Sequence, residues 1–193
     1  MSELNKQERF LELFEPVRIR LSLYARAMTR NSEDAKDLIG DTILAAYENL
    51  DKVREPVAFA SYIFSIASNA NKRKHRRLRI FGPYNESLAE QIPDTSIRLE
   101  SIVDTQFLYL ALDKLPAKQK EAVVLFEISG FALEEIKKIQ GGTLSGVKSR
   151  IKRGREQLAV LMGVDSSPKK FDDTADLQCE PEAETAQVEL GIG

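Results

Sequence analysis

The sequence predicts an all-α protein in which two small helical domains are joined by a flexible linker. Apolar residues recur at three- and four-residue spacing over most of the 193 residues, and the alternating pattern of a strand is almost absent. That spacing lapses between residues 81 and 103, where glycine and proline stand among mostly acidic charges. Residues 1–80 and 104–162 are therefore expected to fold as helical domains on either side of a linker at 81–103.

Three helices are expected in the first domain. The apolar side of the first helix is formed by Phe10, Leu13, Val17, Leu21, Tyr24 and Met28. The second helix is predicted from about Ser32 to Leu50, with Asn31 or Ser32 as its N-terminal cap. Pro56 interrupts the pattern, and the third helix is predicted from Val57 to Arg79, apolar in its first half and basic in its second.

The second domain is predicted to end in two helices joined by a tight turn. Pro116 suits the start of a preceding helix that stops at Gly130. A short helix is then predicted at Leu133–Gln140, and Gly141-Gly142-Thr143 reverses the chain. The last helix is predicted over residues 143–158.

The composition argues against several classes of protein. No apolar run approaches the roughly 18 residues of a membrane-spanning helix, so no membrane insertion is expected. The N-terminus lacks the apolar core of a secretion signal, so we expect a cytoplasmic protein. One cysteine, Cys179, and one histidine, His75, allow no internal disulfide and no Cys/His metal set. Without a glycine-rich phosphate loop or a nucleophile beside a base, neither an enzyme nor a cofactor is expected.

The net charge of −2 conceals an asymmetry along the chain. Counting Asp, Glu, Lys and Arg, residues 1–162 sum to +4 and residues 163–193 sum to −6. Six Lys or Arg residues fall between Lys72 and Arg79, and five between Lys148 and Arg155. Two basic segments predict a polyanionic partner that is touched at two places. The acidic tail at 163–193 is expected to be disordered, either as a solubilising extension or as a competitor of DNA.

A short helix, a glycine-containing turn and a basic helix are typical of a DNA-binding helix-turn-helix. The angle between the two helices would be set by packing of Ile136 and Ile139 against Val147 and Ile151. Thr143 can cap the second helix, whose side chains that can reach DNA are Ser145, Lys148, Ser149 and Lys152. Taken alone, the pattern fits equally well a basic amphipathic helix that only faces solvent.

Motifs in both domains identify a family. The second domain carries Leu115-Pro116, Gly130, Glu134-Glu135-Ile136, Val147-Lys148-Ser149-Arg150 and Arg153-Gly154-Arg155. In this order they resemble region 4 of the extracytoplasmic-function sigma factors. The first domain carries Asp34-Ala35, Asp37-Leu38-Ile39, Asp41-Thr42, Phe59, Tyr62-Ile63, Ile66-Ala67 and Asn69. These motifs resemble region 2 of the same family, so that the resemblance covers roughly residues 10–162.

The resemblance implies a transcription initiation factor that binds RNA polymerase core and directs it to promoter DNA, with an anti-sigma protein as a further partner. The residues implied to bind polymerase are Asp37, Leu38, Asp41, Thr42 and Tyr47. Those implied to contact the −10 element are Arg54, Asn69, Lys72, Arg73, Arg76 and Arg77. Those implied to contact the −35 element are Thr143, Ser145, Lys148, Ser149, Lys152, Arg153 and Arg155.

Two alternatives follow from the same residues. Gly40 stands where the family usually has glutamine, at a cost of up to about 1 kcal/mol in helix propensity relative to alanine. This departure leaves open a degenerate sigma-like adaptor that binds polymerase or an anti-sigma protein without selecting promoters. The other alternative is a polymerase-independent helix-turn-helix regulator whose N-terminal helices dimerise or sense a signal. Ala132 stands where a capping serine is common, so the helix that follows is expected to be less well capped.

Overall fold

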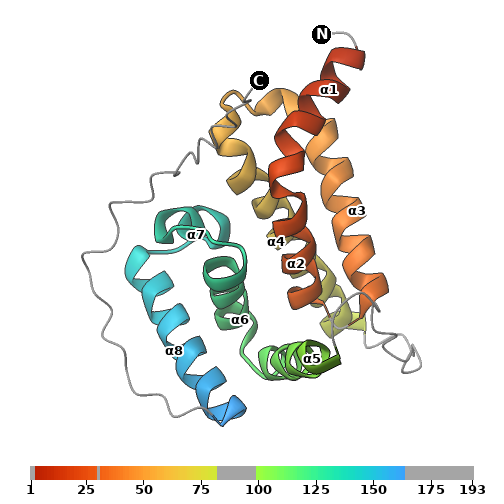
Figure 1. Ribbon diagram of the computed structural model, residues 1–193. Coiled ribbons are helices and arrows are strands. Elements are labelled where there is room, and N and C mark those ends of the chain that lie inside the picture. Colours follow the sequence, from red (N-terminus) through yellow and green to blue (C-terminus); the bar gives the residue numbers. More distant parts are fainter. Residues whose placement is uncertain (1–2, 30, 82–98, 164–193) are drawn as a thin grey trace, which may run out of the picture.

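The described part of the chain forms two neighbouring helical bundles (Figure 1). The computed structural model describes residues 3–29, 31–81 and 99–163, and no strand occurs among them. The α-helices are α1 (Glu3–Phe14), α2 (Arg18–Met28), α3 (Ser32–Glu48), α4 (Phe59–Phe81), α5 (Leu99–Asp113), α6 (Ala117–Val123), α7 (Leu133–Gln140) and α8 (Leu144–Met162). Short 3-10 turns occur at Glu15–Val17, Leu50–Lys52 and Pro56–Ala58, and a π-helical turn at Val124–Ile128 continues α6. The predicted all-α fold is confirmed for these residues.

Helices α1 to α4 form the first bundle around a cluster of aromatic rings. The ring of Phe10 stacks on Phe14 with 5.6 Å between centroids. It meets Tyr47 and Phe59 edge-on at 5.4 and 5.9 Å. Such pairs add about 0.5–1.5 kcal/mol each beyond the burial of their area. Three helices that are distant in the sequence are thereby held at one point.

The helix ends follow most of the sequence signals, with two differences. The first predicted helix is divided into α1 and α2 by the 3-10 turn at Glu15–Val17, which contains Pro16. The side chain of Asn31 accepts a hydrogen bond from the Asp34 N–H at 2.7 Å, so Asn31 is the cap of α3. Gly130 has a φ of 65°, as expected where the chain leaves the helix before it. Helix α5, however, begins at Leu99, inside the predicted linker. Residues 82–98, which are most of that linker, and residues 164–193 of the acidic tail, with Cys179, lie outside the described residues.

Helices α6 and α8 of the second bundle cross closely because Gly154 has no side chain. Gly154 is buried, and a Cβ atom placed on it would lie 2.6 Å from Cγ2 of Val123. It would also lie 3.4 Å from the carbonyl oxygen of Gln119. This crossing holds α8 against a core that includes Val147 and Ile151, both fully buried.

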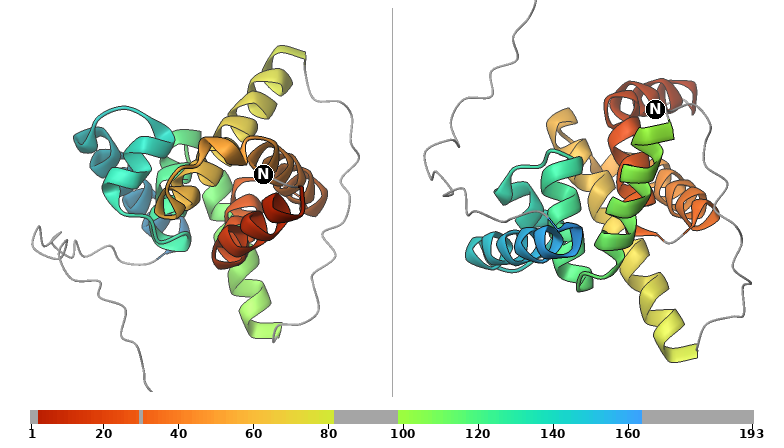
Figure 2. Two further views of the ribbon diagram at one scale, coloured as in Figure 1. Left: turned by 90° about the horizontal axis from the view of Figure 1, so that it is seen from above. Right: turned by 60° about the horizontal axis from the view of Figure 1, so that its bottom comes forward.

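The two bundles share one continuous core. Helix α4 packs along α7, and α2 packs on the π-helical turn. The ring of Phe64 lies 5.3 Å from Tyr24 of its own bundle and 4.6 Å from Phe131 of the other. Phe64 is therefore fully buried, although its own bundle covers only part of it. The C-terminal turns of α4 project beyond both bundles (Figure 2).

Two helical glycines predict opposite effects of the same substitution. Gly154→Ala places a methyl group against Val123, and overpacking of this kind costs about 1–3 kcal/mol against a gain of up to about 1 kcal/mol in helix propensity. Gly40→Ala meets no atom within 4 Å, so only the propensity gain remains. We expect urea denaturation to show a lower free energy of unfolding for Gly154→Ala and a higher one for Gly40→Ala. Stabilisation by both substitutions would contradict the close crossing of α6 and α8.

Candidate nucleic-acid and docking interfaces

The helix-turn-helix forms as the sequence predicts. Ile136 and Ile139 of α7 are buried in one cluster with Val147 and Ile151 of α8. The hydroxyl oxygen of Thr143 accepts a hydrogen bond from the Gly146 N–H at 3.1 Å and caps α8. The amino end of α8, with its unpaired N–H groups and positive dipole, is therefore available to an anion.

Capping at the start of α7 is partial, as expected for an alanine at position 132. Ala132 has no side-chain acceptor, so one half of a capping box cannot form. The other half does form, because Glu135 Oε2 accepts a hydrogen bond from the Ala132 N–H at 2.9 Å. The start of α7 thus relies on Glu135 alone.

Arg150 stabilises the turn between α7 and α8 through hydrogen bonds to residues of the turn. Its guanidinium donates hydrogen bonds to Oε1 of Gln140 and, at 3.2 Å, to the carbonyl oxygen of Gly141. Gly141 and Gly142 have φ values of 77° and 98°, which side-chain-bearing residues rarely adopt. A Cβ on Gly142 would lie 2.9 Å from Arg150 Nη2. One basic residue of the Lys148–Arg155 segment thus supports the turn, a role that its charge alone does not indicate.

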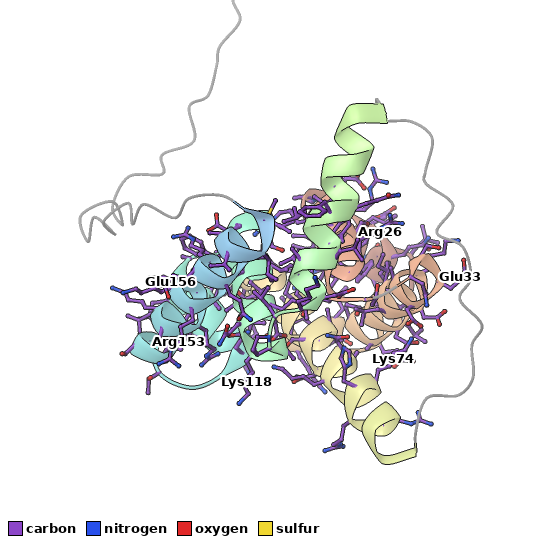
Figure 3. All side chains as sticks on the ribbon, turned by 90° about the horizontal axis from the view of Figure 1, so that it is seen from below. Arg26, Glu33, Lys74, Lys118, Arg153 and Glu156 are labelled. Carbon is purple, nitrogen blue, oxygen red and sulfur yellow. The ribbon has the colours of Figure 1, made fainter. Side chains whose placement is uncertain are left out.

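The outward side of α8 is polar and basic. Ser145, Lys152 and Arg153 are exposed, and Lys148 and Ser149 are half-buried near the amino end of the helix. Figure 3 shows Arg153 on the outer side of the helix-turn-helix, away from Lys74 on α4. These residues, with the cap Thr143, share one surface that a DNA duplex can reach.

Arg155 differs from the other residues expected at this surface. Its guanidinium forms an ion pair with Glu127 of the π-helical turn and lies 5.1 Å from the ring centroid of Phe126. Both partners belong to the second bundle itself. In this conformation Arg155 links α8 to the end of α6, and its side chain remains 40% exposed.

A second basic surface lies on the C-terminal half of α4. Asn69, Lys72, Arg73 and Arg76 line a shallow hollow of about 340 Å³. Arg77 on α4 and Arg54 in the preceding loop are also exposed. All six residues expected at the −10 element are therefore accessible to solvent. Lys74 has a different role, because it pairs with Asp34 at the start of α3.

The residues expected to bind polymerase divide between surface and core. Asp37 and Asp41 are exposed on α3. Leu38 is 5% exposed and Thr42 is fully buried, with its hydroxyl donating to the Leu38 carbonyl oxygen at 2.6 Å. The side chains of Leu38 and Thr42 thus pack inside the first bundle and cannot touch a partner in this conformation. Tyr47 is half-buried beside Phe10.

An exposed leucine extends the outer face of α3. Leu44 is 59% exposed and lies one helical turn beyond Asp41, on the same side of the helix. Its spacing from Asp37 and Asp41 was the signal in the sequence that could have placed it there. A large exposed apolar residue between acidic ones is a common feature of a protein-binding surface.

The described residues contain neither a metal site nor a membrane span. Across residues 3–29, 31–81 and 99–163, no three His, Cys, Asp or Glu side chains are grouped so that they could hold an ion. No helix in the described part of the chain is long and apolar enough to cross a bilayer.

Comparison with known proteins finds both domains. Residues 13–80 match the family model of sigma-70 region 2, and residues 107–158 match that of sigma-70 region 4. The sigma factor EcfG of Rhodopseudomonas palustris is 32% identical over 152 residues, which are 76% of this chain and 81% of EcfG. SigM of Mycobacterium tuberculosis is 30% identical over 154 residues, which are 80% of this chain and 77% of SigM.

Two solved structures have the same fold. The sigma factor RpoE of Bartonella quintana, in complex with the anti-sigma factor NepR, aligns with a TM-score of 0.66 at 29% identity. The alignment covers 85% of this chain and 99% of RpoE. CnrH in complex with the cytosolic domain of CnrY aligns with a TM-score of 0.63 at 25% identity, covering 83% of this chain and 91% of CnrH.

Region 2 followed by region 4 defines a transcription initiation factor of the sigma-70 type. The relatives are named as extracytoplasmic-function factors, and the first of them shares 32% of its residues with this chain over most of its length. The chain belongs to the extracytoplasmic-function family of RNA polymerase sigma factors.

The positions of Arg153 and Arg155 predict different salt dependences of DNA binding. Each phosphate contact contributes about 0.9 to the slope of log affinity against log salt concentration. Arg153→Ala should lower that slope by about 0.9, whereas Arg155→Ala should leave it unchanged because Arg155 is paired with Glu127. Any duplex DNA serves, since phosphate contacts do not depend on sequence. Anisotropy titrations between roughly 50 and 200 mM salt, the range in which such contacts are titrated, measure both slopes. Equal changes of slope for the two variants would contradict this assignment.

Proposed function

We propose that this sigma factor docks on RNA polymerase core through the outer face of α3. The basic surface of α4 then holds the −10 element, and α8 enters the major groove at the −35 element. The observation that carries the proposal is that three helices expose separate charged faces: α3 exposes acidic residues, and α4 and α8 expose basic ones. Leu38 and Thr42 support the docking face from inside, while Asp37, Asp41 and Leu44 form it.

Promoter binding requires the two bundles to separate. The names of the two elements place them about 25 base pairs apart, which is about 85 Å at the 3.4 Å rise of B-DNA. A compact chain of about 150 residues has a radius of gyration of only about 15 Å. The 17 residues between α4 and α5 can span at most about 60 Å when extended. This length, added to the size of the bundles, allows α4 and α8 to reach both elements.

The partners follow from this role. The chain binds and positions, and the polymerase carries out catalysis, so no activity or cofactor of its own is needed. It acts in the cytoplasm, where polymerase and promoter DNA are found. RpoE was solved with the anti-sigma factor NepR, and CnrH with the cytosolic domain of CnrY. We extend control by an anti-sigma protein to the present chain.

The two alternatives differ from this proposal in testable ways. A polymerase-independent regulator does not need a region 2, which residues 13–80 match. A degenerate adaptor would bind core polymerase and then fail to start transcription. Run-off transcription with core polymerase on genomic promoter fragments separates the three, because only the proposed sigma factor gives discrete transcripts.

The docking face predicts a loss of polymerase binding on charge reversal. Asp41→Lys places a cation in the exposed acidic face of α3 and should weaken core binding by at least about tenfold, since like-charge contacts at an interface are costly. Glu12→Lys makes the same change of charge at an exposed position on α1 and serves as the matched control. Titration of labelled factor with core polymerase measures both. Equal affinities for Asp41→Lys and Glu12→Lys would exclude this face.

The amino end of α8 predicts which residues read sequence. Lys148→Ala should relax base preference at one or two neighbouring positions of the −35 element, because this side chain lies where α8 enters the groove. Lys152→Ala, one turn further along, should weaken binding evenly across sequences. Selection from a randomised duplex library with the full-length protein gives both profiles. If Lys152→Ala changes the base preference and Lys148→Ala does not, the helix is docked in a different register.

A further inference from the structure

A buried carboxylate lies at the contact between the two bundles. Glu121 of α6 is only 3% exposed. Its Oε1 atom accepts hydrogen bonds from the hydroxyl groups of Tyr24 at 3.2 Å and Ser68 at 2.5 Å. Its Oε2 atom accepts one from Gln140 Nε2 at 2.8 Å and lies 3.6 Å from Lys72 Nζ. Three of these four partners belong to the first bundle.

The environment of Glu121 depends on contact between the bundles. A carboxylate removed from water needs hydrogen bonds or opposite charge, and loss of these partners is strongly unfavourable. Burial, followed by the negative charge of Glu121, raises the pKa of the Tyr24 phenol well above its usual range, so Tyr24 keeps its proton and donates. When α6 moves away from α2 and α4, Gln140 alone of the four partners moves with it.

Other contacts close the same interface around an apolar centre. Arg20 of α2 donates to the carbonyl oxygen of Ser129 at 2.7 Å, and its guanidinium lies 4.5 Å from the ring centroid of Phe131. Phe131 in turn covers Phe64. The interface therefore has a desolvated aromatic centre with polar groups beside it, as in stable contacts between domains.

Glu121 is also connected to the DNA-binding turn. Gln140, which donates to Glu121, accepts through Oε1 a hydrogen bond from Arg150. Arg150 donates as well to the carbonyl oxygen of Gly141. A continuous set of hydrogen bonds therefore runs from Ser68 on α4 through Glu121 to the turn that orients α8.

We propose that Tyr24, Ser68, Lys72 and Glu121 form a latch that holds the free factor closed and self-inhibited. In the closed state the carboxylate of Glu121 pairs with Lys72, a cation of the −10 surface, and so competes with DNA for it. The two bundles also stay too close together to span a promoter. DNA phosphate and Glu121 compete for Lys72, so binding at α4 favours opening. The closed state itself does not depend on the proposed function, whereas its inhibitory role rests on it.

The latch is tested by the distance between the bundles in the full-length protein. Dyes at Glu33→Cys and Glu156→Cys, after Cys179→Ser, report on opening by single-molecule energy transfer, since both positions are exposed and lie on different bundles (Figure 3). The double variant Tyr24→Phe/Ser68→Ala removes two hydroxyl donors to Glu121 with little change of shape. Hydrogen bonds to a charged group are strong enough that we expect the open-to-closed ratio to rise at least about tenfold.

A matched control is available on α4. Tyr62→Phe/Ser65→Ala removes one tyrosine and one serine hydroxyl group, and the Ser65 hydroxyl donates within the helix to the Ser61 carbonyl oxygen at 2.7 Å. Its open-to-closed ratio should equal that of the parent protein. An unchanged ratio in Tyr24→Phe/Ser68→Ala overturns the latch. If far-UV circular dichroism shows that Tyr24→Phe/Ser68→Ala has lost helix, Lys72→Met, at a half-exposed position, replaces it as the test variant. Its open-to-closed ratio should rise about threefold, and an unchanged ratio overturns the latch.

Two further readouts separate the latch from the proposed function. Hydrogen exchange at the amides of residues 141–143 should be faster in Tyr24→Phe/Ser68→Ala, and unchanged exchange overturns the connection to the turn. Single-stranded DNA of promoter sequence should shift the parent protein toward low energy transfer. Absence of this DNA response while Tyr24→Phe/Ser68→Ala still opens would refute promoter contact by Lys72 and leave the latch intact.

Discussion

Helix α4 faces the core of the first bundle, the second bundle and solvent on three different sides. The angular position of each side chain around the helix decides which of the three it meets. At about 100° per residue, Phe59 and Ile63 share one side, which packs within the first bundle. Phe64 and Ser68 lie on a second side against Phe131 and Glu121. The third side carries Asn69, Arg73 and Arg76 to solvent. One helix thus forms the core, the contact with the second bundle and a basic surface.

Because of this division, the proposed closure and DNA binding depend on the same helix. Lys72 lies at the border between the second and third sides of α4, where it is near both Glu121 and the solvent-exposed basic residues. A charged side chain at such a border responds to whichever anion is nearer and less hydrated. In the opening that we propose, Lys72 loses Glu121, and the charge that α4 presents changes without any change within the helix itself.

In the second bundle, close backbone approach and internal hydrogen bonds determine the direction of α8. Gly154 lets α8 lie against α6, and Arg150 fastens the turn through Gln140 and Gly141. Arg155 pairs with Glu127 at the other end of the same contact. Basic residues thus have two distinct uses on α8. Some hold the helix in place, and the exposed Lys152 and Arg153 belong to the surface that we propose for DNA.

The sequence by itself determined the helical class, the helix-turn-helix, the cap Thr143 and the family, because spacing, capping and turn chemistry act over a few residues. For α3 it offered Asn31 or Ser32 as the cap, and the structure shows that Asn31 accepts the hydrogen bond. The sequence did not indicate that α5 begins at Leu99, since tertiary contacts decide where a weakly periodic helix starts. Only the tertiary structure decided that Leu38 and Thr42 are buried while Asp37 and Asp41 are exposed, and that Arg155 pairs with Glu127. It also decided that Glu121 meets Tyr24, 97 residues away. Pairing between distant residues depends on how whole helices pack, and no local pattern in the chain encodes that packing.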